Sequence, residues 1–184
     1  MTEPGRSKLW MRRDSLEGLP PSYCPQGCQI RVYRDGDAEA WERIVAIAFG
    51  EPIPFADKVA SRPSYRPDRV LFVCRGFEPV ATASALEPDE PETREPYAGY
   101  VHMVGALPAY AGLGLGYAAT LAALRKMEEE GKRSALLKTD DFRLPAIRTY
   151  LKLGFVPDAR EADHQARWTE IIRRIAAWNR TRLP

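Results

Sequence analysis

The feature that most constrains the fold of this 184-residue chain is a glycine-rich stretch, Ala111–Gly116, with the sequence AGLGLG. It follows a β-type segment at 99–107 and precedes a helical pattern at 114–130, so it joins a strand to a helix. Glycine lets the backbone approach a ligand closely because it has no Cβ. The free N–H groups of a first helical turn, with the helix dipole behind them, favour a phosphate. The stretch therefore predicts a chain with strands and helices that holds a phosphate-bearing ligand at a strand-to-helix loop.

Two phosphate-loop patterns from other folds can be compared with these glycines. Gly114–Ala119 (GLGYAA) matches the G-x-G-x-x-A form of the dinucleotide fingerprint, and Asp140 follows the next strand near the ribose-binding spacing. A dinucleotide-binding oxidoreductase therefore stays open as an alternative, although the expected strand ends at Leu107, well before the first glycine. A P-loop is excluded because no Lys-Ser or Lys-Thr pair follows the glycines.

The rest of the chain alternates between strand-like and helix-like segments. Apolar alternation and β-branched residues predict strands at 29–33, 70–74, 79–86, 99–107, 134–139 and 155–156. Apolar residues at helical spacing predict helices at 37–50, 114–130, 144–153 and 162–180, the last of them amphipathic. A turn at 75–78 makes residues 70–86 a hairpin. The order is mixed α and β with an antiparallel middle.

Residues 1–28 differ in character from the remainder. They contain four prolines and show little periodicity, so we expect a flexible N-terminal extension. A single domain is then expected over residues 29–184, a length that can bury a full core. Met1–Arg13 lacks the apolar centre of a signal peptide, and no apolar run approaches the length of a membrane span. We therefore expect a cytoplasmic protein with no membrane partner.

Charge and cysteine content exclude further classes of function. The chain has 27 basic and 25 acidic side chains, a net charge of +2, which gives no electrostatic footprint for nucleic acid. Its three cysteines are an odd number in a chain that is not cysteine-rich, so no disulfide framework is expected. Cys24 and Cys28 would need two further ligands to hold zinc, and the only histidines are His102 and His164. We therefore expect no metal site.

Two blocks of sequence together resemble the GNAT superfamily of N-acetyltransferases. In the first, Pro108–Gly116, a proline near the end of a strand precedes the spaced glycines of the family's loop motif, Arg or Gln-x-x-Gly-x-Gly or Ala. In the second, Asp140–Pro157, the run PAIRTYLKLGF resembles the family's Pro-Ala-Ile-x-x-Tyr-x-x-Leu-Gly-Phe. The chain departs from the family at Ala111, usually Arg or Gln, and at Arg143, usually Asn. The blocks stand in the family's order and cover 100–157, about a third of the chain.

This resemblance implies a fold and an activity. The fold would be α/β (α+β), with a mixed, mainly antiparallel central sheet flanked by helices and here a C-terminal helix. The co-substrate would be acetyl-CoA, and its acetyl group would pass by direct attack to a primary amine of a small molecule or peptide. The backbone of Val104–Leu107 would hold the acetyl carbonyl and the pantetheine. The co-substrate-binding residues implied are Ala106, Leu107, Gly112, Leu113, Gly114, Leu115, Gly116 and Tyr117.

Two side chains are candidates for the chemistry of acetyl transfer. Tyr150 matches the tyrosine of the second block, which in many family members protonates the departing thiolate. The alternative is a core tyrosine whose hydroxyl meets a backbone group. His102, on the strand that leads to the glycines, is a candidate general base because imidazole ordinarily titrates near neutral pH; otherwise it is a strand histidine that faces solvent. The other candidates for the base are Glu51, Asp140, Asp141 and a chain of water molecules.

A second class of function stays open beside the enzyme. Without the family's usual side chains at Ala111 and Arg143, the chain could be a non-catalytic acyl-CoA-binding module. The identity of an acceptor would be set by the loops at 52–67 and 87–97, where no motif is found. We expect a monomer or a homodimer. No role is assigned to three cationic side chains on the predicted helices, Arg125, Arg148 and Lys152.

Overall fold

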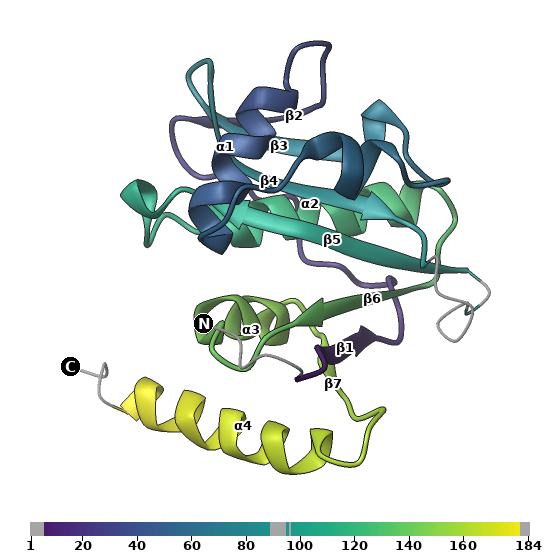
Figure 1. Cartoon of the computed structure of the whole chain (residues 1–184), viewed down its shortest axis with the longest axis vertical. Helices are drawn as coiled ribbons and strands as arrows, with labels where there is room; N and C mark the ends of the chain where they lie inside the picture. Colours follow the sequence, from purple (N-terminus) through teal and green to yellow (C-terminus); the bar gives the residue numbers. More distant parts are fainter. Residues whose placement is uncertain (1–5, 89–94, 96, 181–184) are drawn as a thin grey trace.

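The computed structural model describes residues 6–88, 95 and 97–180 of the chain. Seven strands form one sheet in the order β2-β3-β4-β5-β6-β1-β7, with α1 in front of it and α2 behind it (Figure 1). The strands are β1 (Leu9–Arg13), β2 (Cys28–Val32), β3 (Val70–Arg75), β4 (Glu78–Leu86), β5 (Ala98–Ala106), β6 (Ser134–Thr139) and β7 (Val156–Asp158). The helices are α1 (Ala38–Phe49), α2 (Leu115–Glu129), α3 (Leu144–Lys152) and α4 (His164–Arg180). The mixed sheet, its flanking helices and the C-terminal helix confirm the predicted fold class.

The directions of the strands explain where the sheet opens. Neighbouring strands are antiparallel except β5 and β6, which are parallel and are connected through α2. β5 pairs with β6 only from Ala98 to Val101, although β5 continues to Ala106. The two strands therefore separate beyond Val101, and the loop before α2 lies at this opening (Figure 1). On its other side β5 bulges against β4 near Met103, whose φ is +49°.

The helices predicted from sequence form within a few residues of their expected ends. α1 buries Trp41, Ile44 and Val45 and is followed by Gly50, whose φ is +80°. Glycine takes this left-handed conformation without steric cost, so the predicted end of the helix is confirmed. α2 packs against β3, β4 and β5, and α4 places Trp168 in the core. In the described part of the chain, no helix is both long and apolar enough to cross a membrane.

The N-terminal segment departs from the expectation drawn from sequence. β1 lies between β6 and β7 and pairs with both, so the flexible extension expected over residues 1–28 is wrong for residues 9–13. Leu9 and Met11 are fully buried there. The apolar run LWM, Leu9–Met11, was the one local signal for a strand in this segment. Strand propensity alone does not reveal it, because the position that this strand fills is created by two strands much later in the chain.

The chain that follows β1 also packs against the domain. Leu16 is buried, and its N–H donates to the Arg133 carbonyl at 2.7 Å. The Arg125 side chain, on α2, donates to the carbonyl of Pro20. The segment between β1 and β2 is therefore attached to α2, and this attachment brings Tyr23 to the glycine-rich loop.

Candidate active site

A cavity of about 600 Å³ opens beside the diverging ends of β5 and β6. Its walls are the end of α1, the end of β5 with the glycine-rich loop, the first turn of α2 and one face of α3. It is lined by Ile47, Ala48, Val104, Gly105, Ala106, Leu107, Pro108, Tyr110, Ala111, Gly112, Gly114, Leu115, Gly116, Tyr117, Arg143, Pro145, Ala146, Thr149 and Tyr150. The cavity thus joins the two sequence blocks, although a helix and a strand separate them along the chain.

The glycine-rich loop presents the N-terminus of α2 to this cavity. Gly112 and Gly114 have φ values of +88° and +75°, and Gly114 is the N-cap residue of α2. No side chain caps the helix, and the Ala118 N–H donates to the Gly114 carbonyl. The N–H groups before Ala118 therefore have no acceptor within the helix, as at any α-helix N-terminus. Together with the helix dipole they can hold a phosphate or diphosphate.

Tyr23, from the segment before β2, braces this loop. Its hydroxyl donates to the Leu113 carbonyl at 3.4 Å, and its ring meets Tyr117 edge-on with centroids 5.6 Å apart. A Cβ at Gly114 would lie 3.2 Å from the Tyr23 hydroxyl, so a side chain there would crowd Tyr23, and the φ of +75° favours glycine. Sequence reasoning missed Tyr23 because 90 positions separate it from the residue that it contacts.

The residues implied as co-substrate ligands fall into two groups. Seven of the eight line the cavity: Ala106, Leu107, Gly112, Gly114, Leu115, Gly116 and Tyr117. Leu113 does not line it; this residue is 40% exposed, and its carbonyl accepts a hydrogen bond from Tyr23. Leu115 has a buried side chain, so it would offer its backbone to a ligand.

Tyr150 lies on the face of α3 that lines the cavity, and only 6% of the residue is exposed. Its ring packs against Phe155, with centroids 6.0 Å apart. Burial disfavours the charged phenolate and raises the pKa of Tyr150 to about 12, while the positive charge of Arg143 opposes part of this rise. The phenol is therefore neutral at physiological pH and can donate a hydrogen bond.

None of the side chains considered as a general base lines the cavity. His102 is on β5, but its Nε2 lies 3.0 Å from the Lys58 carbonyl, on the far side of the bulge from Val104. Glu51 is exposed beyond the end of α1. Asp140 and Asp141 are also absent from the lining, and each pairs with cationic side chains.

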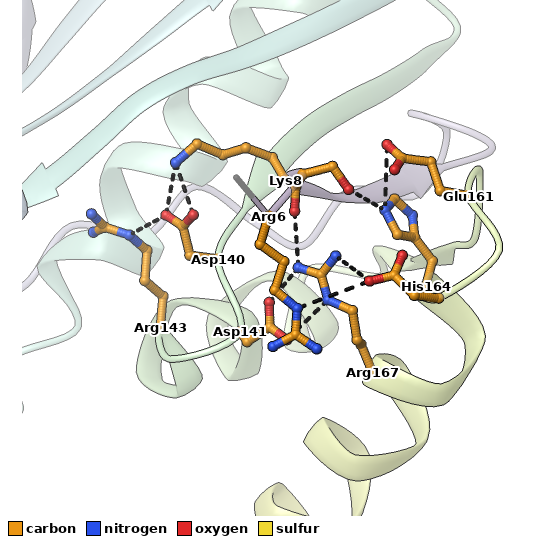
Figure 2. A network of polar contacts seen from close by, with 10 residues as sticks. Arg6, Lys8, Asp140, Asp141, Arg143, Glu161, His164 and Arg167 are labelled. Atoms are coloured by element: carbon orange, nitrogen blue, oxygen red, sulfur yellow. Dashed lines mark hydrogen bonds and ion pairs between the residues drawn. The ribbon is translucent and has the colours of Figure 1, made fainter. Parts of the chain in front are cut away.

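Arg143 lines the cavity from the start of α3, at the position where the family pattern usually has asparagine. Its Nε donates to Asp140 at 3.1 Å, and Lys8 donates to both oxygens of the same carboxylate at 2.8 and 2.9 Å (Figure 2). Its Nη1 donates to the Ala48 carbonyl at 3.4 Å, and its guanidinium carbon lies 4.0 Å from the centre of the Phe49 ring. These contacts join α3 to α1 and to the N-terminal segment, and they engage Asp140 with two cations.

Asp141 belongs to a second ionic group (Figure 2). Arg167 of α4 donates to its two oxygens at 2.5 and 3.1 Å and to the Ser7 carbonyl at 2.9 Å. The hydrogen bond from Arg167 lowers the pKa of Asp141 despite the partial burial of this carboxylate, which makes it a weak base. The group attaches α4 to the loop before α3 and to the segment that leads into β1.

Three further side chains, Glu161, Asp163 and His164, each place a possible metal-ligand atom within 4.8 Å of the others. His164 is fully buried, and its Nδ1 accepts the Arg160 N–H at 3.3 Å. A neutral imidazole then carries its proton on Nε2, which lies 3.2 Å from the Ser7 hydroxyl. Both ring nitrogens are thus engaged in hydrogen bonds, so the arrangement serves to hold the start of α4.

The helix cations without an assigned role lie outside the lining of the cavity. Arg125 donates to the Pro20 carbonyl, the guanidinium carbon of Arg148 lies 4.7 Å from the centre of the Trp178 ring, and Lys152 is exposed.

A second cavity, of about 630 Å³, contains none of the residues expected to act. The charged side chains in its walls largely form ion pairs with one another: the Glu87 carboxylate lies 3.0 Å from Lys132 and 3.3 Å from Arg69. The cavity at the glycine-rich loop is therefore the candidate active site.

Comparisons with known proteins agree with this geometry. The model of the acetyltransferase (GNAT) family matches residues 38–155. Mycothiol acetyltransferase of Frankia casuarinae is 32% identical over 174 residues, which cover 86% of this chain and 51% of that protein. The crystal structure of a GCN5-related N-acetyltransferase from Sphaerobacter thermophilus has a TM-score of 0.65 at 21% identity, over 82% of this chain and 48% of that one. A GCN5-related N-acetyltransferase from Kribbella flavida has a TM-score of 0.58 at 26% identity, over 82% and 55%.

The extent of these matches differs between the family and the individual relatives. The chain spans about half the length of the curated relatives it matches, 51% and 49% of two mycothiol acetyltransferases. The family model, in contrast, covers well over half of this chain and includes every element that lines the cavity, from α1 to α3. The chain belongs to the acetyltransferase (GNAT) family.

Proposed function

We propose that this chain is an N-acetyltransferase that moves the acetyl group of acetyl-CoA to a primary amine of a small molecule or peptide. The observation that carries the proposal is a single cavity lined both by the uncapped N-terminus of α2 and by the buried phenol of Tyr150. The relatives named mycothiol acetyltransferase support acetyl transfer to a small molecule.

The residues present fit an acyl-CoA substrate. The first turn of α2 offers N–H groups to the diphosphate, and a Cβ at Gly112 or Gly116 would meet no atom within 4 Å, so the space beside the backbone is open to a ligand. Met103 and Val104 have no partner residue in β4 or β6, which leaves backbone groups for the thioester carbonyl and the pantetheine amides. Because Ala111 stands where the family usually has Arg or Gln, diphosphate binding would depend on the backbone N–H groups of the first turn of α2.

Acetyl transfer needs a neutral amine, a polarised carbonyl and a stabilised leaving group. The amine attacks the thioester carbonyl carbon, a C–N bond forms, the C–S bond breaks, and the nitrogen loses a proton. Tyr150, as the acid, donates a hydrogen bond to sulfur while negative charge develops there. Because the pKa of Tyr150, about 12, exceeds that of an ordinary thiol, about 8.5, solvent completes the protonation of the thiolate.

The proton of the amine leaves through water in this proposal, since none of the candidate bases lines the cavity. The rate should then follow the neutral fraction of the acceptor and rise with pH up to the pKa of the acceptor itself. His102→Gln should keep this profile, because His102 is bonded to the Lys58 carbonyl outside the cavity. A profile whose acid limb disappears in His102→Gln would instead return the base role to this histidine.

The test begins with isothermal titration calorimetry of the protein with acetyl-CoA, and with NADH as the control ligand. Saturable binding of acetyl-CoA and none of NADH is expected. Steady-state assays on a panel of primary amines follow, with wild type and Tyr150→Phe. We expect the variant to keep its KM for acetyl-CoA and to lose about 100-fold in kcat, a typical contribution of one hydrogen-bond donor to a developing negative charge.

Three results would contradict the proposal in different ways. Binding of acetyl-CoA without turnover of any amine would favour the acyl-CoA-binding module. Binding of NADH in preference to acetyl-CoA would favour the dinucleotide-binding alternative suggested by Gly114–Ala119. An unchanged kcat in Tyr150→Phe would leave the transferase in place and remove Tyr150 from its mechanism.

A further inference from the structure

The charge of the cavity wall is one-sided. Among the described residues that line the cavity, Arg143 is the one with a charged side chain, and no carboxylate is present. An acceptor that carries a second positive charge would therefore find no counter-ion in the lining, and it would meet a like charge instead. The wall favours an acceptor with the opposite charge.

The positive charge of Arg143 is not cancelled by its neighbours. Among the residues that the structure describes, Asp140 is its one ionic partner, and Asp140 also accepts two hydrogen bonds from Lys8, so the three groups together carry one positive charge. The charge also reaches the reaction site, because it opposes the rise in the pKa of Tyr150. The net positive charge at Arg143 would therefore attract an anionic group bound in the cavity.

The guanidinium of Arg143 is held in place and still has donors to spare. Nε is used by Asp140 and Nη1 by the Ala48 carbonyl, and the ring of Phe49 supports one side of the group. Nη2 has no hydrogen-bond partner among the described residues, and 19% of the side chain is exposed. The terminal nitrogens point away from Asp140 in Figure 2. A fixed guanidinium with a free N–H edge is a good partner for a carboxylate or phosphate.

Arg143 belongs to a different wall of the cavity from the N–H groups that suit a phosphate. Arg143 contacts the end of α1 through Ala48 and Phe49. The N–H groups suited to the diphosphate belong to the first turn of α2, whose loop contacts Tyr23 instead. The diphosphate of acyl-CoA would therefore bind at the wall formed by the first turn of α2, and Arg143, on another wall, would be left for the acceptor.

We infer that the acceptor amine belongs to a molecule with an anionic group, such as a carboxylate, and that Arg143 binds this group. The inference rests on the proposed acetyl transfer, because it assigns a substrate class to the same cavity. Arg143 is a specificity residue in this account, while Tyr150 serves the leaving group. Diamines and polyamines are then poor acceptors.

The test compares two probe amines of nearly equal basicity, para-(aminomethyl)benzoate and para-(aminomethyl)benzamide. In wild type, kcat/KM should be about tenfold higher for the benzoate, the size expected for one charge-assisted contact at a partly exposed site. Arg143→Gln should bring this ratio close to one with an unchanged KM for acetyl-CoA, and Arg143→Lys should retain part of the preference. Arg148→Gln is the matched control and should keep the preference, because Arg148 is a cation of the same helix that packs on Trp178 and does not line the cavity.

The possible failures are distinguishable. Equal rates for the two probes in wild type, or an undiminished preference in Arg143→Gln, would overturn the inference. A raised KM for acetyl-CoA with an unchanged ratio would assign Arg143 to the co-substrate and would overturn it as well. If neither probe is acetylated, calorimetry with para-toluate and para-toluamide in the presence of CoA decides. Binding of para-toluate that Arg143→Gln abolishes supports the anion site while the transferase fails, and no preference for para-toluate refutes the site.

Discussion

Replacing Tyr150 with phenylalanine removes one hydroxyl from the cavity wall and leaves the packing of the ring on Phe155 in place. In the folded protein, burial raises the pKa of this phenol from 10.0 to about 12. In the unfolded chain the phenol is solvated and titrates near its ordinary value. Between these two values the unfolded state releases the proton and the folded state keeps it. The phenol therefore makes the free energy of unfolding fall as pH rises through this range.

The size of the effect follows from the shift in pKa. Two pKa units correspond to about 3 kcal/mol at most, and about 1.4 kcal/mol of this should be lost by pH 11, midway through the interval. Below about pH 9 the contribution is fully present, because Tyr150 is neutral in both states. Tyr150→Phe cannot ionise at this position, so its stability should lack this component.

Urea unfolding of wild type and Tyr150→Phe, measured in steps between about pH 8 and pH 11, isolates the contribution because every other titrating group is common to both proteins. The difference in unfolding free energy should be constant at the lower end and should then fall by about 1.4 kcal/mol. A difference that does not change with pH would show that the phenol is solvated in the folded state. The account of Tyr150 as a buried, neutral hydrogen-bond donor would then be refuted.

Three other perturbations test separate parts of the structure. Leu9→Ala should lower the unfolding free energy by about 3 kcal/mol in urea denaturation, because it leaves a cavity at a fully buried position of β1, and a loss near zero would contradict the place of β1 in the sheet. Gly114→Ala should weaken acetyl-CoA binding in calorimetry about tenfold, since the methyl group meets Tyr23 at 3.2 Å and a φ of +75° is unfavourable for alanine; unchanged affinity would show that the loop tolerates a side chain. The folded-state pKa of Asp141 is lowered by Arg167, so the stability from this pair is present above about pH 4 and is lost as pH falls further. Asp141→Asn should therefore flatten the acid limb of a thermal-unfolding profile, and an unchanged limb would mean that this pair contributes nothing.

Much of the fold and the position of the cavity could be predicted from local sequence. The glycines at 112–116 predicted a strand-to-helix loop whose backbone a ligand can approach closely, and the loop lies between β5 and α2 with Gly112, Gly114 and Gly116 in the lining of the cavity. Gly50 ends α1 as expected. The family resemblance of the two sequence blocks also implied that the glycine-rich loop and Tyr150 belong to one site, and both line one cavity.

The partners of the site residues could not be predicted in this way. Lys8 reaches Asp140 across 132 positions, and Tyr23 reaches the Leu113 carbonyl in the glycine-rich loop across 90. His102 stands close to the glycines in sequence, yet the bulge near Met103 and the separation of β5 from β6 leave it outside the cavity. The short sequence distance between His102 and the glycine-rich loop therefore did not predict whether His102 lines the cavity.

What the sequence by itself determined were the features that depend on neighbours along the chain: helix ends, the glycine-rich loop and the helical face that carries Tyr150. Steric limits on φ and ψ and the periods of helix and strand act within a few residues, so composition and spacing reveal them. Only the tertiary structure decided that β1 fills a place between β6 and β7, that Arg143 shares Asp140 with Lys8, and that the phenol of Tyr150 is desolvated. Burial and charge pairing depend on which distant segments meet, and that is fixed by the packing of the whole sheet.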